Sequence, residues 1–272
     1  MSWLSSRVRS VRAKTALITG ASGGIGLELA RLCARDGANV ILVARRASEL
    51  ARLSADLHDE HGIMAVSYVK DLSKPNAAAE LAEQIHRPDN ELNQVEILIN
   101  NAGVGDYGPF VDSSVGRQSA MCQLNMTALV ELTHLFLPGM IERGWGRVMN
   151  VASTAAFQPG PLMSVYYASK AFILHFSEAI ANELEGSGVF VTALCPGPTA
   201  TGFMTEANMD GSGLTKKLPL MDPVEVARLG YKGMLKGKPV VVTGLRNRLV
   251  ASTVGFLPRG AVTRVSRYIQ DP

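Results

Sequence analysis

Seven short apolar runs rich in β-branched residues alternate with longer stretches of helical periodicity. The runs cover residues 15–19, 40–44, 65–69, 97–100, 147–152, 189–194 and 240–243. Alternation of this kind favours right-handed crossovers, which gather parallel strands into one sheet and place helices on both of its faces. We therefore expect an α/β fold with a doubly wound, seven-stranded parallel sheet.

The same pattern predicts a single domain over residues 1–272, because no repeat or low-complexity linker divides it. Its core covers about residues 14–243, and a basic extension covers about 244–272. Gly37 and Ala38 end the first helix, while Asp222 and Pro223 suit the N-cap and first turn of a helix through Tyr231. Between residues 196 and 221 the pattern lapses, which predicts a mobile lid.

The composition is that of a compact globular protein, with 47% hydrophobic and 19% charged residues. No apolar run is long enough to predict a transmembrane helix, and residues 1–14 are basic without the apolar core of a signal peptide. Cys33, Cys122 and Cys195 are scattered, and neither they nor the five histidines have metal-ligand spacing. We expect a reduced, cytoplasmic, metal-free protein.

The net charge of +3 is unevenly distributed, because residues 226–270 contain nine basic residues and no acid. This segment could face solvent, an acidic carrier or anionic lipid. Residues 245–269 could form interfacial helices for weak peripheral contact with a membrane, although a subunit contact would use the same apolar side chains. A nucleic-acid partner is not expected, since no recognised reading module is present. The side chains available for an apolar face are Leu249, Val250, Val254, Phe256 and Leu257.

A GxxxGxG turn follows the first predicted strand and opens a helix. Glycines at these positions permit a tight turn and a close backbone approach, so that a pyrophosphate can lie at the positive end of the helix. The turn comprises Gly20, Ser22, Gly23, Gly24, Ile25 and Gly26, with Ala21 between the first two.

The end of the second strand carries Arg45 and Arg46, where an NAD-selective unit usually has an acid for the ribose hydroxyls. The guanidinium of Arg45 suits a 2′-phosphate, with Arg46 and the Ser22 hydroxyl as helpers. We therefore predict NADP(H) rather than NAD.

Tyr166 and Lys170 are four residues apart in a helical stretch, which places a phenol beside an ammonium group. Lowering a tyrosine pKa from about 10 to about 7 requires roughly 4 kcal/mol of preferential stabilisation of the phenolate. A neighbouring cation can supply much of this energy, so the pair suits proton transfer. Tyr167 points about 100° away and is expected in the core or the pocket wall.

Together these motifs resemble the classical short-chain dehydrogenase/reductase family, and the resemblance covers about residues 14–243. It implies a Rossmann fold. The matching positions are Thr19, Gly20, Gly24 and Gly26 for TGxxxGxG, residues 100–103 for NNAG, Asn125, Ser153, Tyr166 and Lys170 for the catalytic tetrad, and Pro196 and Gly197 for the PG motif.

The resemblance gives each residue of the tetrad a role. Tyr166 is the general acid or base, and Ser153, at the end of the fifth strand, donates a hydrogen bond to the substrate oxygen. Lys170 lowers the phenol pKa and binds the nicotinamide ribose, while Asn125 holds a water that links the lysine to solvent. A local backbone bond is the alternative role for Asn125.

Further cofactor contacts are implied in the same way. Asn101, Ala102 and Gly103 pack against the adenine ribose, and Asp71 and Leu72 against the adenine ring. Gly23 departs from the serine or basic residue common in the family, which leaves a 2′-phosphate more dependent on Arg45. The nicotinamide carboxamide is gripped by the segment containing Pro196, Gly197, Thr199 and Thr201.

Apolar residues around the predicted lid suit a hydrophobic ketone, alcohol or ketoacyl substrate, although several of them also suit the core. We predict an NADPH-dependent carbonyl reductase or alcohol dehydrogenase. A non-catalytic NADP-binding subunit and a lipid reductase docked on a membrane are the alternatives. The family resemblance implies a homo-oligomer, either tetramer or dimer. The apolar residues are Phe157, Leu162, Met163, Phe203, Met204, Met209, Leu214, Leu218, Leu220 and Met221.

Overall fold

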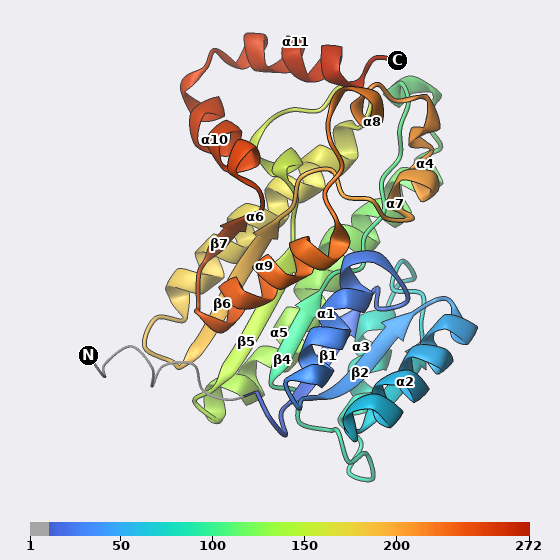
Figure 1. The fold of residues 1–272 in the computed structure, drawn as a ribbon, viewed down its shortest axis with the longest axis vertical. Helices are drawn as coiled ribbons and strands as arrows, with labels where there is room; N and C mark the ends of the chain where they lie inside the picture. The colour runs from blue at the N-terminus through green and yellow to red at the C-terminus, as the bar shows by residue number, and fades with distance from the viewer. Residues whose placement is uncertain (1–10) are drawn as a thin grey trace.

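The computed structural model describes residues 11–272, apart from the side chains at positions 210 and 215. The first ten residues of the predicted domain therefore lie outside the described part. Seven parallel strands form one sheet in the order β3-β2-β1-β4-β5-β6-β7, which confirms the predicted α/β doubly wound architecture (Figure 1). The strands are β1 (Thr15–Thr19), β2 (Asn39–Ala44), β3 (Ala65–Val69), β4 (Ile97–Asn100), β5 (Gly146–Val151), β6 (Val189–Cys195) and β7 (Val240–Val242).

Helices cover both faces of the sheet because the central strands are apolar on both sides. One face packs against α1 (Gly24–Arg35), α2 (Ala47–His61) and α9 (Pro223–Leu235). The other packs against α3 (Ala77–Ile85), α5 (Ala128–Glu142) and α6 (Ser164–Glu183). The order of strands reverses direction between β1 and β4, and in such sheets ligands bind beyond the carboxyl ends of the strands at this point.

The helical segment that carries Asn125 is long and irregular. It begins with α4 (Val115–Cys122), passes through a π-helical turn at Gln123–Thr127 and continues as α5, with Pro138 inside it. By length and composition, Val115–Glu142 would suffice to cross a membrane, with a mean hydropathy of 1.2. In this fold α5 packs on the sheet beside α3, which is the environment of a core helix.

The predicted lid contains short helices. After β6 come α7 (Phe203–Glu206), a 3-10 turn at Met209–Gly211 and α8 (Leu214–Lys217), and a bridge joins Thr199 to Met221. The predicted helix after Pro223 extends to Leu235, and the Asp222 carboxylate caps it by accepting from Val224 N at 3.1 Å.

The basic C-terminal extension is helical. It contains α10 (Leu245–Thr253), a 3-10 turn at Val254–Phe256 and α11 (Arg259–Gln270). In Figure 1 these helices form the end of the molecule beyond the carboxyl edge of the sheet, next to α8.

Candidate active site

A cavity of about 1140 Å³ runs along the carboxyl ends of the strands, from the β1–α1 turn past β5 and α6 to the lid, α10 and α11. It brings together nearly all of the predicted site residues, although they come from segments spread over the whole chain. The two that do not line it are Gly26 and Asn125.

The glycine turn requires a left-handed backbone conformation at one position and close backbone packing at another. Gly20 has φ of +66°, and a side chain at Gly26 would collide with Gly20 O and Asn101 Nδ2. Asn101 Nδ2 donates to Thr19 O at 2.9 Å and to Gly20 O at 3.2 Å. These hydrogen bonds from Asn101 hold the glycine turn in shape.

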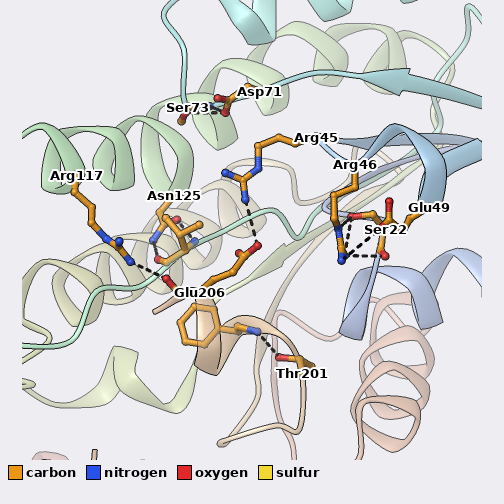
Figure 2. Close-up of polar contacts among 12 residues, drawn as sticks. Ser22, Arg45, Arg46, Glu49, Asp71, Ser73, Arg117, Asn125, Thr201 and Glu206 are labelled. Atoms are coloured by element: carbon orange, nitrogen blue, oxygen red, sulfur yellow. Dashed lines mark hydrogen bonds and ion pairs between the residues drawn. The ribbon is translucent and has the colours of Figure 1, made fainter. Parts of the chain in front are cut away.

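Arg46, Ser22 and Glu49 form a polar cluster at the nucleotide end of the cavity, as shown in Figure 2. Arg46 Nη2 donates to Ser22 O at 2.9 Å and to Ser22 Oγ at 3.1 Å. A Cβ at Gly23 would lie 2.8 Å from the same nitrogen, so this glycine leaves room for the guanidinium. The side chains of Arg46 and Ser22 are therefore hydrogen-bonded to each other in the protein alone.

Arg45 makes its contact with the lid. Its Nη2 lies 3.3 Å from Oε1 of Glu206 on α7, and both side chains are more than half exposed (Figure 2). Arg117 Nη2 donates to the backbone oxygen of Glu206 at 2.6 Å. The predicted phosphate-binding arginine therefore shares its charge with a carboxylate on the opposite wall of the cavity.

Asp71 lies at the predicted adenine end, with its Oδ1 accepting from Ser73 N at 3.1 Å and Ser73 Oγ at 2.7 Å. Partial burial raises the pKa of Asp71, but these hydrogen bonds and the charge of Arg45 outweigh it, so its pKa lies below the usual value. Asp71 is therefore an anion at neutral pH and suits hydrogen-bond donors.

Tyr166 and Ser153 meet in the middle of the cavity. Ser153 follows β5, and its Oγ accepts from Ala155 N at 3.1 Å. Burial raises the pKa of Tyr166 well above its ordinary value, while a hydrogen bond with Ser153 lowers it in part. The phenol therefore carries its proton at neutral pH.

Lys170 is buried below Tyr166, and its Nζ donates to Val151 O at 2.7 Å. Burial lowers the pKa of Lys170 to about 8, and Nζ lies 5.7 Å from the centre of the Tyr166 ring. In the protein alone, burial therefore outweighs the predicted lowering of the Tyr166 pKa by this cation. Desolvation is the dominant influence on both groups, and it disfavours the charged form of each.

Asn125 lies on the π-helical turn and is 1% exposed. Its Oδ1 accepts from Val104 N at 3.0 Å, and its Nδ2 donates to Val104 O at 3.0 Å and to Ser169 Oγ at 3.1 Å. These bonds differ from the alternative of a local backbone bond, because Val104 is 21 residues away in the sequence and Ser169 is 44 residues away. Asn125 therefore ties the loop after β4 to α6, the helix that carries Tyr166 and Lys170.

Two threonine hydroxyl groups in the segment after β6 hydrogen-bond to its backbone and hold its shape. Thr199 Oγ1 donates to Gly197 O at 2.8 Å, and Thr201 Oγ1 accepts from Phe203 N at 3.3 Å. A Cβ at Gly197 would collide with Asn247 of α10, so this glycine lets the C-terminal extension pack against the site.

The sequence does not reveal that α11 lines the cavity with Val265, Ser266 and Ile269, or that Gln270 anchors this helix behind the wall. Gln270 is fully buried, and its Nε2 donates to the hydroxyl of Tyr167 at 2.8 Å. The hydroxyl of Tyr107 donates to Gln270 O at 2.8 Å. The only signal in the sequence is the spacing of Gln270 from Val262 and Ser266, which are four residues apart and also buried.

The predicted apolar wall is largely present. Leu162 and Leu220 do not line the cavity, and Leu220 is 43% exposed because it lies where the lid leaves the site. Tyr167 lines the pocket and is buried, as predicted. The described residues contain no group of three or more His, Cys, Asp or Glu side chains able to hold a metal ion. The apolar residues that do line the cavity are Phe157, Met163, Phe203, Met204, Met209, Leu214, Leu218 and Met221.

Comparison with known proteins decides the family. A model of the short chain dehydrogenase family matches residues 14–211. The chain belongs to the short-chain dehydrogenase family. This assignment supports an oxidoreductase that acts on CH–OH groups with a nicotinamide cofactor, either NAD or NADP.

Similar proteins include ketoacyl reductase HetN of Nostoc sp., which is 33% identical over 94% of this chain and 88% of its own length. A short-chain dehydrogenase from Sphingobium yanoikuyae, solved in complex with NADPH, is 32% identical to this chain. The two structures align with a TM-score of 0.78 over 89% of this chain and 94% of the Sphingobium chain.

The bulky-bulky ketone specific alcohol dehydrogenase of Comamonas testosteroni is 30% identical, with a TM-score of 0.74 over 89% of this chain and 93% of its own. Other relatives are longer. The chain spans 53% of the very-long-chain 3-oxoacyl-CoA reductase of Laccaria bicolor, with which it shares 33% identity.

Proposed function

We propose that the protein is an NADPH-dependent carbonyl reductase that acts on a lipophilic ketone or a ketoacyl group. The observation that carries the proposal is the layout of one cavity. Ser22, Arg45 and Arg46 lie at its nucleotide end, and Ser153, Tyr166 and Lys170 lie beside an apolar chamber roofed by the lid and α11.

The residues present fit a dinucleotide. Gly20, Gly23 and Gly24 line the cavity with no side chain to obstruct a pyrophosphate, and the amino end of α1 offers backbone N–H groups to it. Arg45 and Arg46 suit a 2′-phosphate, and Asp71 with Leu72 suits the adenine. NADPH supplies the hydride for the reduction.

Tyr166 is the proton donor to the carbonyl oxygen in this mechanism. Its raised pKa keeps the phenol protonated at neutral pH, which is the form that reduction requires. Ser153 donates a second hydrogen bond to the same oxygen and stabilises the negative charge that develops on it. Lys170 places a positive charge beneath the phenol and favours the phenolate left after proton transfer.

The chamber supports an apolar substrate. Methionine and aromatic side chains line it, and these adapt to more than one carbonyl compound. The names of HetN, a ketoacyl reductase, and of the Comamonas enzyme, an alcohol dehydrogenase for bulky ketones, support the same class.

Substituting Tyr166→Phe tests the mechanism. We expect turnover of a panel of apolar ketones to be abolished while the NADPH dissociation constant stays nearly unchanged, because only the transferable proton is lost. Tyr68→Phe, on β3 outside the cavity, is the matched control. Retained turnover in Tyr166→Phe would disprove the assigned role, and an inactive wild-type protein that binds NADPH would favour a non-catalytic subunit.

Substituting Arg45→Ala tests the choice of cofactor. Hydrogen bonds to charged groups contribute about 1.5–3 kcal/mol, so we expect the NADPH dissociation constant to rise by roughly 10- to 100-fold and that of NADH to change little. Arg31→Ala, on the exposed side of α1, is the control. An equal loss of affinity for both cofactors would contradict the 2′-phosphate assignment.

A further inference from the structure

The two C-terminal helices and the turn between them bury Val254 and Val262 but present larger apolar side chains to solvent. We call residues 245–270 of α10, the following 3-10 turn and α11 the C-terminal face. Leu249 is 65% exposed, Phe256 is 89% exposed and Leu257 is 55% exposed. Side chains of this size gathered on one surface indicate an interaction site.

The C-terminal face is also strongly basic. Arg267 pairs with Asp271 at 2.7 Å. In the part of the chain that the structure describes, no carboxylate lies within ion-pair distance of the remaining arginines, which are Arg246, Arg248, Arg259 and Arg264. The apolar side chains are therefore surrounded by positive charge that the protein does not neutralise.

The cavity opens at this same surface. Leu245, Val250 and Val265 line the cavity, yet each is more than half exposed, so they form its rim. Ile269 continues the wall from α11 inward. An apolar molecule that reaches the C-terminal face therefore meets the entrance to the candidate active site.

The charge distribution indicates which kind of partner the C-terminal face binds. A twofold contact between two copies of this face would bring arginines against arginines, because residues 226–270 contain no acid. An anionic bilayer instead offers negative head groups to the arginines and an acyl layer to the exposed apolar side chains.

We propose that the C-terminal face docks this protein on an anionic lipid bilayer and that an apolar carbonyl substrate enters the cavity from the membrane. Leu249, Phe256 and Leu257 insert at the boundary between head groups and acyl chains, and the arginines bind the head groups. The route of the substrate rests on the proposed function, but the docking does not.

Flotation of the full chain with lipid vesicles tests the docking without turnover. We expect binding to phosphatidylcholine vesicles that contain phosphatidylglycerol at low salt, weaker binding at high salt, and little binding to phosphatidylcholine alone. The double variant Leu249→Glu/Phe256→Glu should lose about tenfold or more in vesicle affinity, since both side chains leave the apolar layer. Neither side chain lines the cavity, so reduction of a water-soluble ketone should not change.

Phe110→Glu is the matched control, because Phe110 is 63% exposed and lies outside the C-terminal face and the cavity. It should bind vesicles like the wild type, and thermal melts should show that all variants fold. Absence of binding to anionic vesicles at low salt would overturn the proposal. So would an equal loss in Phe110→Glu, or a fall in the lipid-free mass of the double variant, which would identify a subunit contact.

Discussion

At the scale of single residues, burial controls both titrating groups of the candidate site. It raises the pKa of Tyr166 and lowers that of Lys170 to about 8, so both shifts are towards the neutral form of the group. At neutral pH the phenol is protonated and Lys170 is a cation. This pair of states suits reduction of a carbonyl group.

The Lys170 shift predicts the dependence of cofactor capture on pH. Below pH 8 the ammonium attracts the anionic cofactor, and above pH 8 the charge is lost. We expect kcat/KM for NADPH, at saturating ketone, to be level below about pH 8 and to fall as pH rises above it, because this ratio reports the free enzyme. A steady rise in kcat/KM across the same range would contradict this assignment.

At the scale of elements, one ion pair joins the nucleotide end of the cavity to the lid. Arg45 follows β2 and Glu206 ends α7, and their contact at 3.3 Å crosses the cavity. A 2′-phosphate would compete with this carboxylate for the same guanidinium. The lid is therefore coupled to the arginine that we propose binds the 2′-phosphate.

Glu206→Gln tests this competition. Exposed ion pairs contribute about 0.2–1 kcal/mol, so we expect the NADPH dissociation constant to fall roughly two- to fivefold while that of NADH stays the same. Glu225→Gln, which removes an exposed carboxylate on α9, is the control in the same fluorescence titration. Weaker binding of NADPH to Glu206→Gln would show that Glu206 supports the site instead of competing with the cofactor.

The elements that the sequence predicts well are those with a long or continuous pattern. Buried parallel strands give uninterrupted apolar runs, and all seven predicted strands begin and end within one residue of the structure at each end. Helices α7 and α8 have four residues each, which is too short for a period of 3.6 to appear. The π-helical turn is also invisible, because one extra residue hardly disturbs the apolar pattern.

The candidate site likewise contains residues that local motifs predict and residues that only the folded structure brings together. Gly20, Arg45, Tyr166 and Lys170 belong to local motifs whose spacing carries the chemistry, so the sequence suffices to select them. Gln270 meets Tyr167 across 103 residues, and no local pattern records that contact. The pKa of Tyr166 could not be inferred either, because it depends on burial within the assembled cavity.

At the scale of the whole molecule, apolar side chains are exposed on the helices that carry the catalytic candidates. Phe172 on α6 is 41% exposed and stacks on Phe176, and Leu135 and Ile141 on α5 are also exposed. We propose a homo-oligomer that covers this surface, because a second copy would bury these apolar side chains.

Phe172→Glu tests this assembly. We expect the wild type to elute with a mass that is a multiple of the 29.1 kDa chain in light-scattering chromatography, and the variant to shift to a smaller mass. A buried charge without a partner costs several kcal/mol, which is enough to separate subunits. Val111→Glu, at an 88% exposed position, should keep the wild-type mass. A monomeric wild type would rule out the oligomer.

The three free thiols differ in their accessibility to alkylating reagents. Cys33 and Cys195 are fully buried, and burial raises the pKa of each to about 12, so they resist alkylation. Cys122 is partly exposed and lies three residues before Asn125. A maleimide spin label or fluorophore would therefore attach at one native position beside the π-helical turn, and its spectrum would report on that helix without any engineered cysteine.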